Sequence, residues 1–130
     1  LAGGRERILI VDDEKSMVFS MKIILERLGY TVTALSESSV AVELFRKKPD
    51  DYDLIISDLT MPVLTGDMLA AEVVSIRPDI PVLIATGYSD AVDSDRLRKC
   101  GVRAFISKPF KKKELATTIR AMLDAQQKST

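Results

Sequence analysis

The sequence of 130 residues contains no histidine. This absence excludes imidazole general bases, histidine-ligated zinc, and the Ser-His-Asp and Cys-His arrangements of nucleophilic enzymes. The single cysteine, Cys100, excludes an internal disulfide and fits a reducing compartment. Any chemistry of this chain must therefore use carboxylates, hydroxyls, lysines and backbone groups, with or without a hard metal ion.

The chain also lacks an excess of charge of either sign and any long hydrophobic run. Lys and Arg together number 19, as do Asp and Glu, so no net charge favours nucleic acid or an anionic membrane. The longest apolar runs are strand-sized, far below the roughly 20 residues of a membrane-spanning helix. We expect a cytoplasmic domain without a membrane segment and without direct nucleic-acid binding. Residues 1–6 are expected to be a linker or chain edge, residues 7–126 the folded domain, and residues 127–130 a polar tail.

Short apolar runs rich in β-branched residues recur along the chain. They predict five strands, at residues 7–11, 30–35, 53–57, 81–85 and 104–107. Helical spacing predicts five helices, one ending before Gly29 and the others at about 38–48, 66–77, 90–100 and 111–126. Uninterrupted apolar runs suit strands buried on both faces of a parallel sheet. The alternation predicts an α/β fold, a single doubly wound five-stranded parallel sheet with five helices.

Polar side chains follow four of the five predicted strands. Asp12 and Asp13 follow the first strand, Asp58 the third, Thr86 the fourth and Lys108 the fifth. Ligands of open α/β sheets bind beyond the carboxyl ends of the strands, near the topological switch point. Because these ends share one edge of the sheet, we expect three carboxylates, a hydroxyl and a lysine to converge there.

Three converging carboxylates repel one another, which raises the pKa of at least one of them unless a cation enters. Lys108 supplies one positive charge, and a divalent cation would supply the rest. An all-oxygen site favours Mg²⁺, with Mn²⁺ as the alternative, over zinc. Such an ion keeps open positions for phosphate oxygens, and Thr86 and Lys108 could bind the others. The set of groups predicts phosphoryl transfer with a carboxylate as the nucleophile.

The same residues form a pattern that resembles the receiver domains of response regulators in two-component signalling. The pattern consists of VDDE at 11–14, SDLTMP at 57–62, Gly66, ATG at 85–87 and SKPF at 107–110. Each piece falls at a strand end already singled out, and together the pieces cover nearly the whole chain. The resemblance implies a flavodoxin-like sheet of order 2-1-3-4-5 and a role in a phosphorelay.

The resemblance also implies the phosphoacceptor and the metal ligands. Asp58 matches the residue that accepts a phosphoryl group from a phosphohistidine of a histidine kinase or phosphotransfer protein. Asp12, Asp13 and Asp58 match the carboxylates that hold Mg²⁺, and Thr60 matches the residue that offers its backbone carbonyl to the metal. A domain of this kind is not an enzyme beyond catalysing its own phosphorylation and dephosphorylation.

The conformational switch is implied by the same resemblance. Thr86 matches the hydroxyl that turns towards the phosphoryl group, Lys108 the lysine that pairs with it, and Phe105 the aromatic whose rotamer follows activation. The bond between Lys108 and Pro109 is expected to be cis. Phosphorylation adds roughly −1.5 to −2 charges and would shift the surface of the fourth helix, fifth strand and fifth helix, through which the domain could form a homodimer. Tyr88 would obstruct the attacking water, which predicts slow hydrolysis.

Some of these residues also allow a purely structural interpretation. The acids Asp12 to Glu14 could be first-turn residues that complement a helix dipole, and Glu14 is expected to do only that. Met17, Met21 and Met68 are expected to fill the core rather than to bind copper. Only the occurrence of the acids together with the hydroxyl and the lysine, each at its strand end, favours a functional site.

Two other functions use parts of the pattern. A small Mg²⁺-dependent phosphatase would form a transient aspartyl phosphate, but it would need a second acid where Thr60 stands. A phosphorylation-independent interaction module would leave the acidic site without a function. We therefore expect a phosphoacceptor receiver domain. A hybrid sensor histidine kinase is the leading parent protein, with a multi-domain or stand-alone regulator as the alternative.

Overall fold

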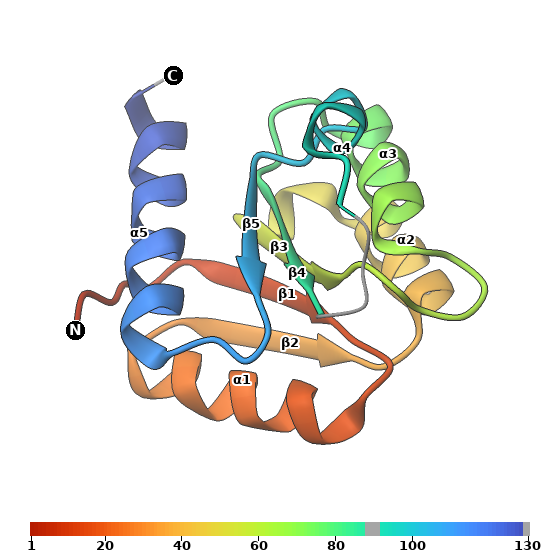
Figure 1. The fold of residues 1–130 in the computed structure, drawn as a ribbon. Helices are drawn as coiled ribbons and strands as arrows, with labels where there is room; N and C mark the ends of the chain where they lie inside the picture. Colours follow the sequence, from red (N-terminus) through yellow and green to blue (C-terminus); the bar gives the residue numbers. More distant parts are fainter. Residues whose placement is uncertain (88–91, 129–130) are drawn as a thin grey trace.

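The computed structural model describes residues 1–87 and 92–128, which form one parallel sheet with helices on both faces (Figure 1). The strands are β1 (Arg7–Val11), β2 (Thr31–Leu35), β3 (Leu54–Asp58), β4 (Val82–Thr86) and β5 (Ala104–Ser107). The helices are α1 (Lys15–Arg27), α2 (Ser38–Lys47), a 3₁₀ turn η1 (Pro49–Asp51), α3 (Gly66–Ile76), α4 (Ser94–Lys99) and α5 (Lys112–Lys128). The predicted α/β fold is confirmed.

The sheet has the order β2-β1-β3-β4-β5, and all four strand pairs are parallel. The chain order reverses at β1, which lies between β2 and β3, so the switch point is the crevice between β1 and β3. Val11 pairs with Ser57 in the register of these two strands. The next residue of each strand, Asp12 and Asp58, therefore lies at the carboxyl end of its strand beside the other.

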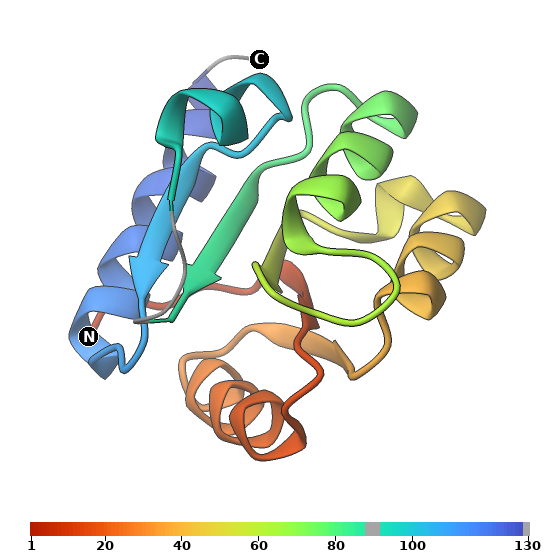
Figure 2. The same ribbon diagram turned by 45° about the vertical axis from the view of Figure 1, so that its right-hand side comes forward.

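Helices cover both faces of the sheet (Figure 2), and each face packs into its own cluster of buried apolar side chains. Successive strand residues point to opposite faces, so Leu9 and Ile55 pack with α2, α3 and α4. Ile10 and Ile56 pack on the other face with α1 and α5. Because both faces are covered, the strands need no polar alternation, as the uninterrupted runs predicted.

Helix α4 is shorter than predicted. It runs from Ser94 to Lys99, although the helical spacing had indicated residues 90–100. Asp93 stands before the helix in an extended conformation, and its side chain accepts a hydrogen bond from the backbone N–H of Arg96. An aspartate in this position caps a helix and so marks its start. Leu97 is the buried residue of the helix, so α4 is lightly packed.

One predicted core residue is exposed. Met68, expected in the core, leaves 48% of its surface in contact with solvent, whereas Met21 is fully buried. Met68 lies on α3 next to Leu69, which takes the buried position at that level of the helix. A residue that lies outside the buried face of a helix is exposed to solvent even when its side chain is apolar.

The segment before β1 contacts the folded domain. The Gly4 N–H donates to the Leu28 carbonyl at 3.1 Å. Arg120 of α5 donates to the Gly3 carbonyl at 3.1 Å and to both carboxylate oxygens of Glu6, at 3.1 and 2.6 Å. A Cβ atom on Gly3 would collide with the Leu28 carbonyl. Glycine therefore allows the chain to approach the α1–β2 turn closely.

Candidate functional site

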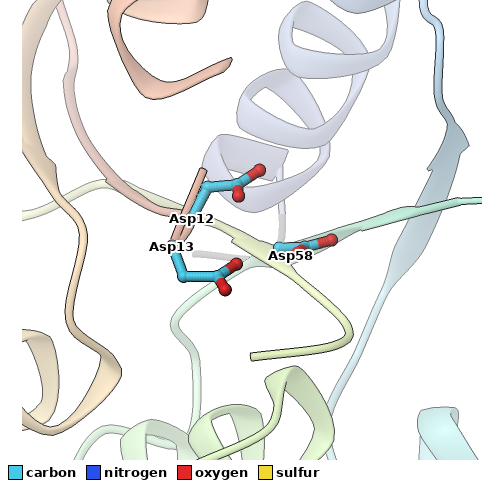
Figure 3. Close-up of side chains that lie close together, drawn as sticks. All are labelled: Asp12, Asp13 and Asp58. Atoms are coloured by element: carbon cyan, nitrogen blue, oxygen red, sulfur yellow. The ribbon is translucent and has the colours of Figure 1, made fainter. Parts of the chain in front are cut away.

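Three carboxylates meet at the carboxyl ends of β1 and β3 (Figure 3). Asp12 and Asp13 directly follow β1, and Asp58 is the last residue of β3. Each contributes an oxygen atom to a group in which all three atoms lie within 4.8 Å of one another. Asp12 and Asp58 are buried and Asp13 is exposed, so the cluster opens to solvent on the side of Asp13.

Lys108 reaches this cluster from the loop between β5 and α5. Its Nζ donates to Asp12 Oδ2 at 2.8 Å and lies 3.1 Å from Asp58 Oδ1. The backbone N–H of Lys108 donates to the Thr86 carbonyl at 2.7 Å, which ties the loop to the end of β4. The bond to Pro109 is cis, as predicted. The expected convergence of the acids and the lysine is present.

Backbone donors and close packing hold the acids in place. The Glu14 N–H donates to Asp12 Oδ1 at 2.9 Å, and the Leu59 N–H donates to Asp58 Oδ1 at 3.0 Å. The hydroxyl of Ser57, a fully buried residue, donates to the Asp58 carbonyl at 2.9 Å. A Cβ atom on Gly66 would collide with that same carbonyl and lie 2.9 Å from the Leu59 Cα atom. Gly66 therefore allows α3 to begin directly against Asp58.

The charges of the site perturb its titration. Burial and the neighbouring Asp12 charge raise the pKa of Asp58, and this outweighs the contacts with Lys108 and Leu59 that lower it. Burial alone would lower the pKa of Lys108, but its bonds to the two aspartates raise it above its ordinary value. Lys108 is therefore charged at neutral pH, while ionised Asp58 is in an unfavourable environment that a further cation would relieve.

The donor set fits a hard divalent cation. The site contains three carboxyl groups but one ammonium group, and the acidic cluster offers oxygen atoms only. Mg²⁺ prefers carboxylate oxygens and water as ligands. The opening beside exposed Asp13 leaves room for the water molecules and phosphate oxygens that such an ion retains.

The other predicted site residues lie around the cluster. Thr86 is buried at the end of β4, and Thr60 is exposed just after β3. Phe105 is half-buried on β5, where it pairs with Ile84 in the strand register. Tyr88, on which the prediction of slow hydrolysis depends, lies outside the described residues.

Some residues that shape the site had no role in the sequence-based prediction. Ser57 carried a signal, a hydroxyl inside an otherwise apolar strand that is buried on both faces. The guanidinium carbon of Arg98 lies 5.8 Å from the centre of the Phe105 ring. Nothing in the sequence pairs these two side chains, because the contact depends on how α4 lies against β5.

The order of the sheet and the acidic pocket at its switch point define a CheY-like signalling domain. Residues 8–120 match the family model of the response regulator receiver domain. The chain belongs to this family of two-component proteins.

Curated relatives place such domains in proteins of different lengths. The chain is 31% identical over 123 residues to the sensor kinase CckA of Brucella abortus, covering 95% of this chain but 13% of that protein. It is 32% identical over 123 residues to the response regulator receiver protein CpdR of the same organism, covering 92% of this chain and 98% of CpdR. The chain spans 20% of the Arabidopsis thaliana response regulator ARR10.

Solved structures of receiver domains share this fold. A response regulator receiver domain protein from Clostridium thermocellum superposes with a TM-score of 0.90 at 28% identity, covering 100% of both chains. A CheY-like receiver domain protein from Methanospirillum hungatei gives a TM-score of 0.88 at 29% identity, covering 98% of this chain and 100% of that one. Within residues 1–87 and 92–128, every helix is too short or too polar to cross a membrane.

Proposed function

We propose that this receiver domain accepts a phosphoryl group on Asp58 from a phosphohistidine of a histidine kinase or phosphotransfer protein. The observation that carries the proposal is the environment of Asp58. Its carboxylate is buried, has a raised pKa, contacts Lys108 and lies beside two further carboxylates at the switch point of the sheet. A buried carboxylate that contacts a fixed cationic group is suited to nucleophilic attack on phosphorus.

In the proposed transfer, a carboxylate oxygen of Asp58 forms a bond to phosphorus while the bond between phosphorus and the histidine nitrogen breaks. The electron pair of the broken bond returns to the imidazole of the donor. The Lys108 ammonium neutralises charge on the phosphoryl oxygens, and the Leu59 N–H holds the acceptor carboxylate in position.

Asp12, Asp13 and Asp58, with the backbone carbonyl of Thr60, would hold Mg²⁺, or Mn²⁺ in its place. The bound ion would neutralise the acidic cluster and the phosphoryl oxygens. The fit of the donor set supports this assignment: the cluster is made only of oxygen atoms, and it opens to solvent beside Asp13.

Phosphorylation would be read out at the surface formed by α4, β5 and α5. Thr86 would donate to the new phosphoryl group, and Phe105 would turn inward as its surroundings rearrange. The light packing of α4 supports this, since a helix with few buried side chains moves at low cost. The same surface is the proposed homodimer contact and the site for an output partner.

The parent protein proposed for this cytoplasmic domain is a hybrid sensor histidine kinase. Similarity to the sensor kinase CckA supports it, because that relative is much longer than this chain. A regulator that consists of a receiver domain is the alternative, supported by the match over 98% of CpdR. The domain itself would catalyse only its own phosphorylation and dephosphorylation.

The test is intact-protein mass spectrometry after incubation with acetyl phosphate, with Mg²⁺ or with EDTA. Wild type should gain one phosphoryl group only with Mg²⁺, and Asp58→Asn should gain none. Asp53→Asn, at the opposite end of β3, is the matched control and should behave like wild type. Absence of any gain with acetyl phosphate and with a phosphohistidine donor would favour an interaction module. Repeated turnover of a phosphomonoester would favour a phosphatase.

A further inference from the structure

Two arginines of α4 attach this helix to its neighbours. Arg96 Nη1 donates to Asp67 Oδ2 at 2.8 Å, which links α4 to the first turn of α3. Arg98 places its guanidinium carbon 5.8 Å from the centre of the Phe105 ring on β5. Between them, Leu97 is fully buried against the core. The helix is thus attached to α3 through one arginine and to the proposed switch aromatic through the other.

The contact between α4 and α3 is an ion pair between Arg96 and Asp67. The Asp67 side chain is 18% exposed. This partial burial would raise the pKa of Asp67, but hydrogen bonds from Thr65 and Arg96 outweigh it and hold that pKa below its ordinary value. The carboxylate is therefore ionised at neutral pH and pairs with Arg96.

The contact of Arg98 depends on where Phe105 lies. Phe105 is half-buried and packs against the core layer formed with α2, α3 and α4. A guanidinium group gains energy only while it stays close to the ring face. If the ring turned inward, Arg98 would either lose this contact or follow into an apolar layer, where an unpaired charge is costly. Either outcome favours the present, half-buried position of the ring.

We propose that Arg96 and Arg98 form a latch that holds α4 and Phe105 in the unphosphorylated arrangement. The inference rests on the proposed function, because it requires phosphorylation of Asp58 to move Phe105 and α4. A contact that is present in only one of two states stabilises that state. The latch therefore lowers the fraction of molecules that adopt the switched arrangement of α4 and Phe105 after phosphorylation. Leu97 is the buried residue of α4, and the contacts of Arg96 and Arg98 add to it two side-chain contacts that depend on the positions of α3 and Phe105.

The test follows Phe105 in solution. The chain has four phenylalanines, so uniform labelling with 4-fluorophenylalanine gives four ¹⁹F resonances, and Phe105→Leu identifies the one of interest. Spectra of wild type with Mg²⁺, before and after addition of beryllofluoride as a phosphoryl mimic, define its two positions. Arg98→Ala without beryllofluoride should move the resonance towards the mimic-bound position. The ratio of inward to outward populations should rise about two- to fivefold, as expected for a cation–π contact at an exposed site.

Matched variants distinguish the latch from a general effect of charge on α4. Lys99→Ala removes the same charge from the adjacent residue and should leave the resonance in place, while Arg98→Lys should have a smaller effect than Arg98→Ala. Arg96→Ala and Asp67→Asn should each shift the resonance in the same direction. The effect of combining them should be smaller than the sum of the two, because both remove one contact.

The results separate failure of the latch from failure of the proposed function. If wild type gains a phosphoryl group and Phe105 responds to beryllofluoride, but Arg98→Ala and Arg96→Ala resemble wild type, the latch is wrong and the phosphoacceptor function stands. An equal shift in Lys99→Ala would also overturn it. If wild type neither gains a phosphoryl group nor responds to beryllofluoride, the proposed function fails and the latch with it.

Discussion

Replacement of Asp58 by asparagine should stabilise the metal-free domain at neutral pH. The carboxylate is buried beside Asp12, and these two causes raise its pKa in the folded state. Asparagine has nearly the same shape and can still accept the Leu59 N–H bond that Asp58 Oδ1 accepts at 3.0 Å. The substitution therefore removes an unfavourable charge while it preserves the local geometry.

Coulombic estimates suggest a modest net gain. With an effective dielectric constant of about 20, attraction to Lys108 across 3.1 Å is worth about 5 kcal/mol. Repulsion from Asp12, whose oxygen lies within 4.8 Å, is at least about 3.5 kcal/mol on the same scale. Desolvation of the carboxylate and the screened charge of Asp13 add to the repulsive side. The raised pKa of Asp58 indicates that the unfavourable contributions exceed the attraction to Lys108. We therefore expect the free energy of unfolding of the variant to be about 1 kcal/mol higher than that of wild type.

The stability difference between Asp58→Asn and wild type should increase as pH rises. In the unfolded chain Asp58 ionises near its ordinary pKa of about 4, and in the folded domain it ionises at higher pH. Wild type therefore loses stability relative to the variant as pH rises through the interval between these two values. The difference should be complete above the folded pKa and should vanish below the unfolded one, where Asp58 is protonated in both states.

The assay is urea unfolding followed by far-UV circular dichroism, because the chain has no tryptophan. In EDTA at pH 7 the variant midpoint should lie about 0.5 M above that of wild type, for a typical slope of about 2 kcal/mol per molar urea. Mg²⁺ should stabilise wild type more than the variant, since binding to the folded state adds its own free energy. Glu6→Gln is the control and should destabilise, because Arg120 lowers the pKa of Glu6. A lower midpoint for Asp58→Asn in EDTA at pH 7 would refute the reasoning.

Two further substitutions test the packing around the site and the segment before β1. Gly66→Ala should lower the rate of phosphorylation by acetyl phosphate about tenfold or more, because the added Cβ collides with the Asp58 carbonyl and displaces the acceptor. An unchanged rate, measured by intact mass, would contradict that role. Arg120→Met should lower the free energy of unfolding by about 1 kcal/mol at pH 7, since it removes the partner of Glu6. This loss should shrink as pH falls through the lowered pKa of Glu6, and a loss equal at pH 3 and pH 7 would exclude the ion pair as its cause.

Much of the fold could be predicted from local patterns. The strand-sized apolar runs and their alternation with helical segments indicated a parallel sheet covered on both faces, as observed. The ends of helices were harder to predict where a capping residue, and not the apolar spacing, marks the first turn. Asp93 does this at the start of α4. The exposure of Met68 could not be predicted from its hydrophobicity, because its neighbour Leu69 takes the buried position.

The sequence by itself determined which groups surface at the ends of buried strands, and so placed Asp12, Asp58 and Lys108 at one edge of the sheet. Only the tertiary structure decided their contacts, since Lys108 meets Asp12 across 96 residues of chain. It also decided the close approach of Gly66 to Asp58 and the position of Arg98 over Phe105. The physical reason is that the periodicity of side chains specifies element type and buried face locally, whereas distances between elements depend on strand register, loop path and packing of the whole domain.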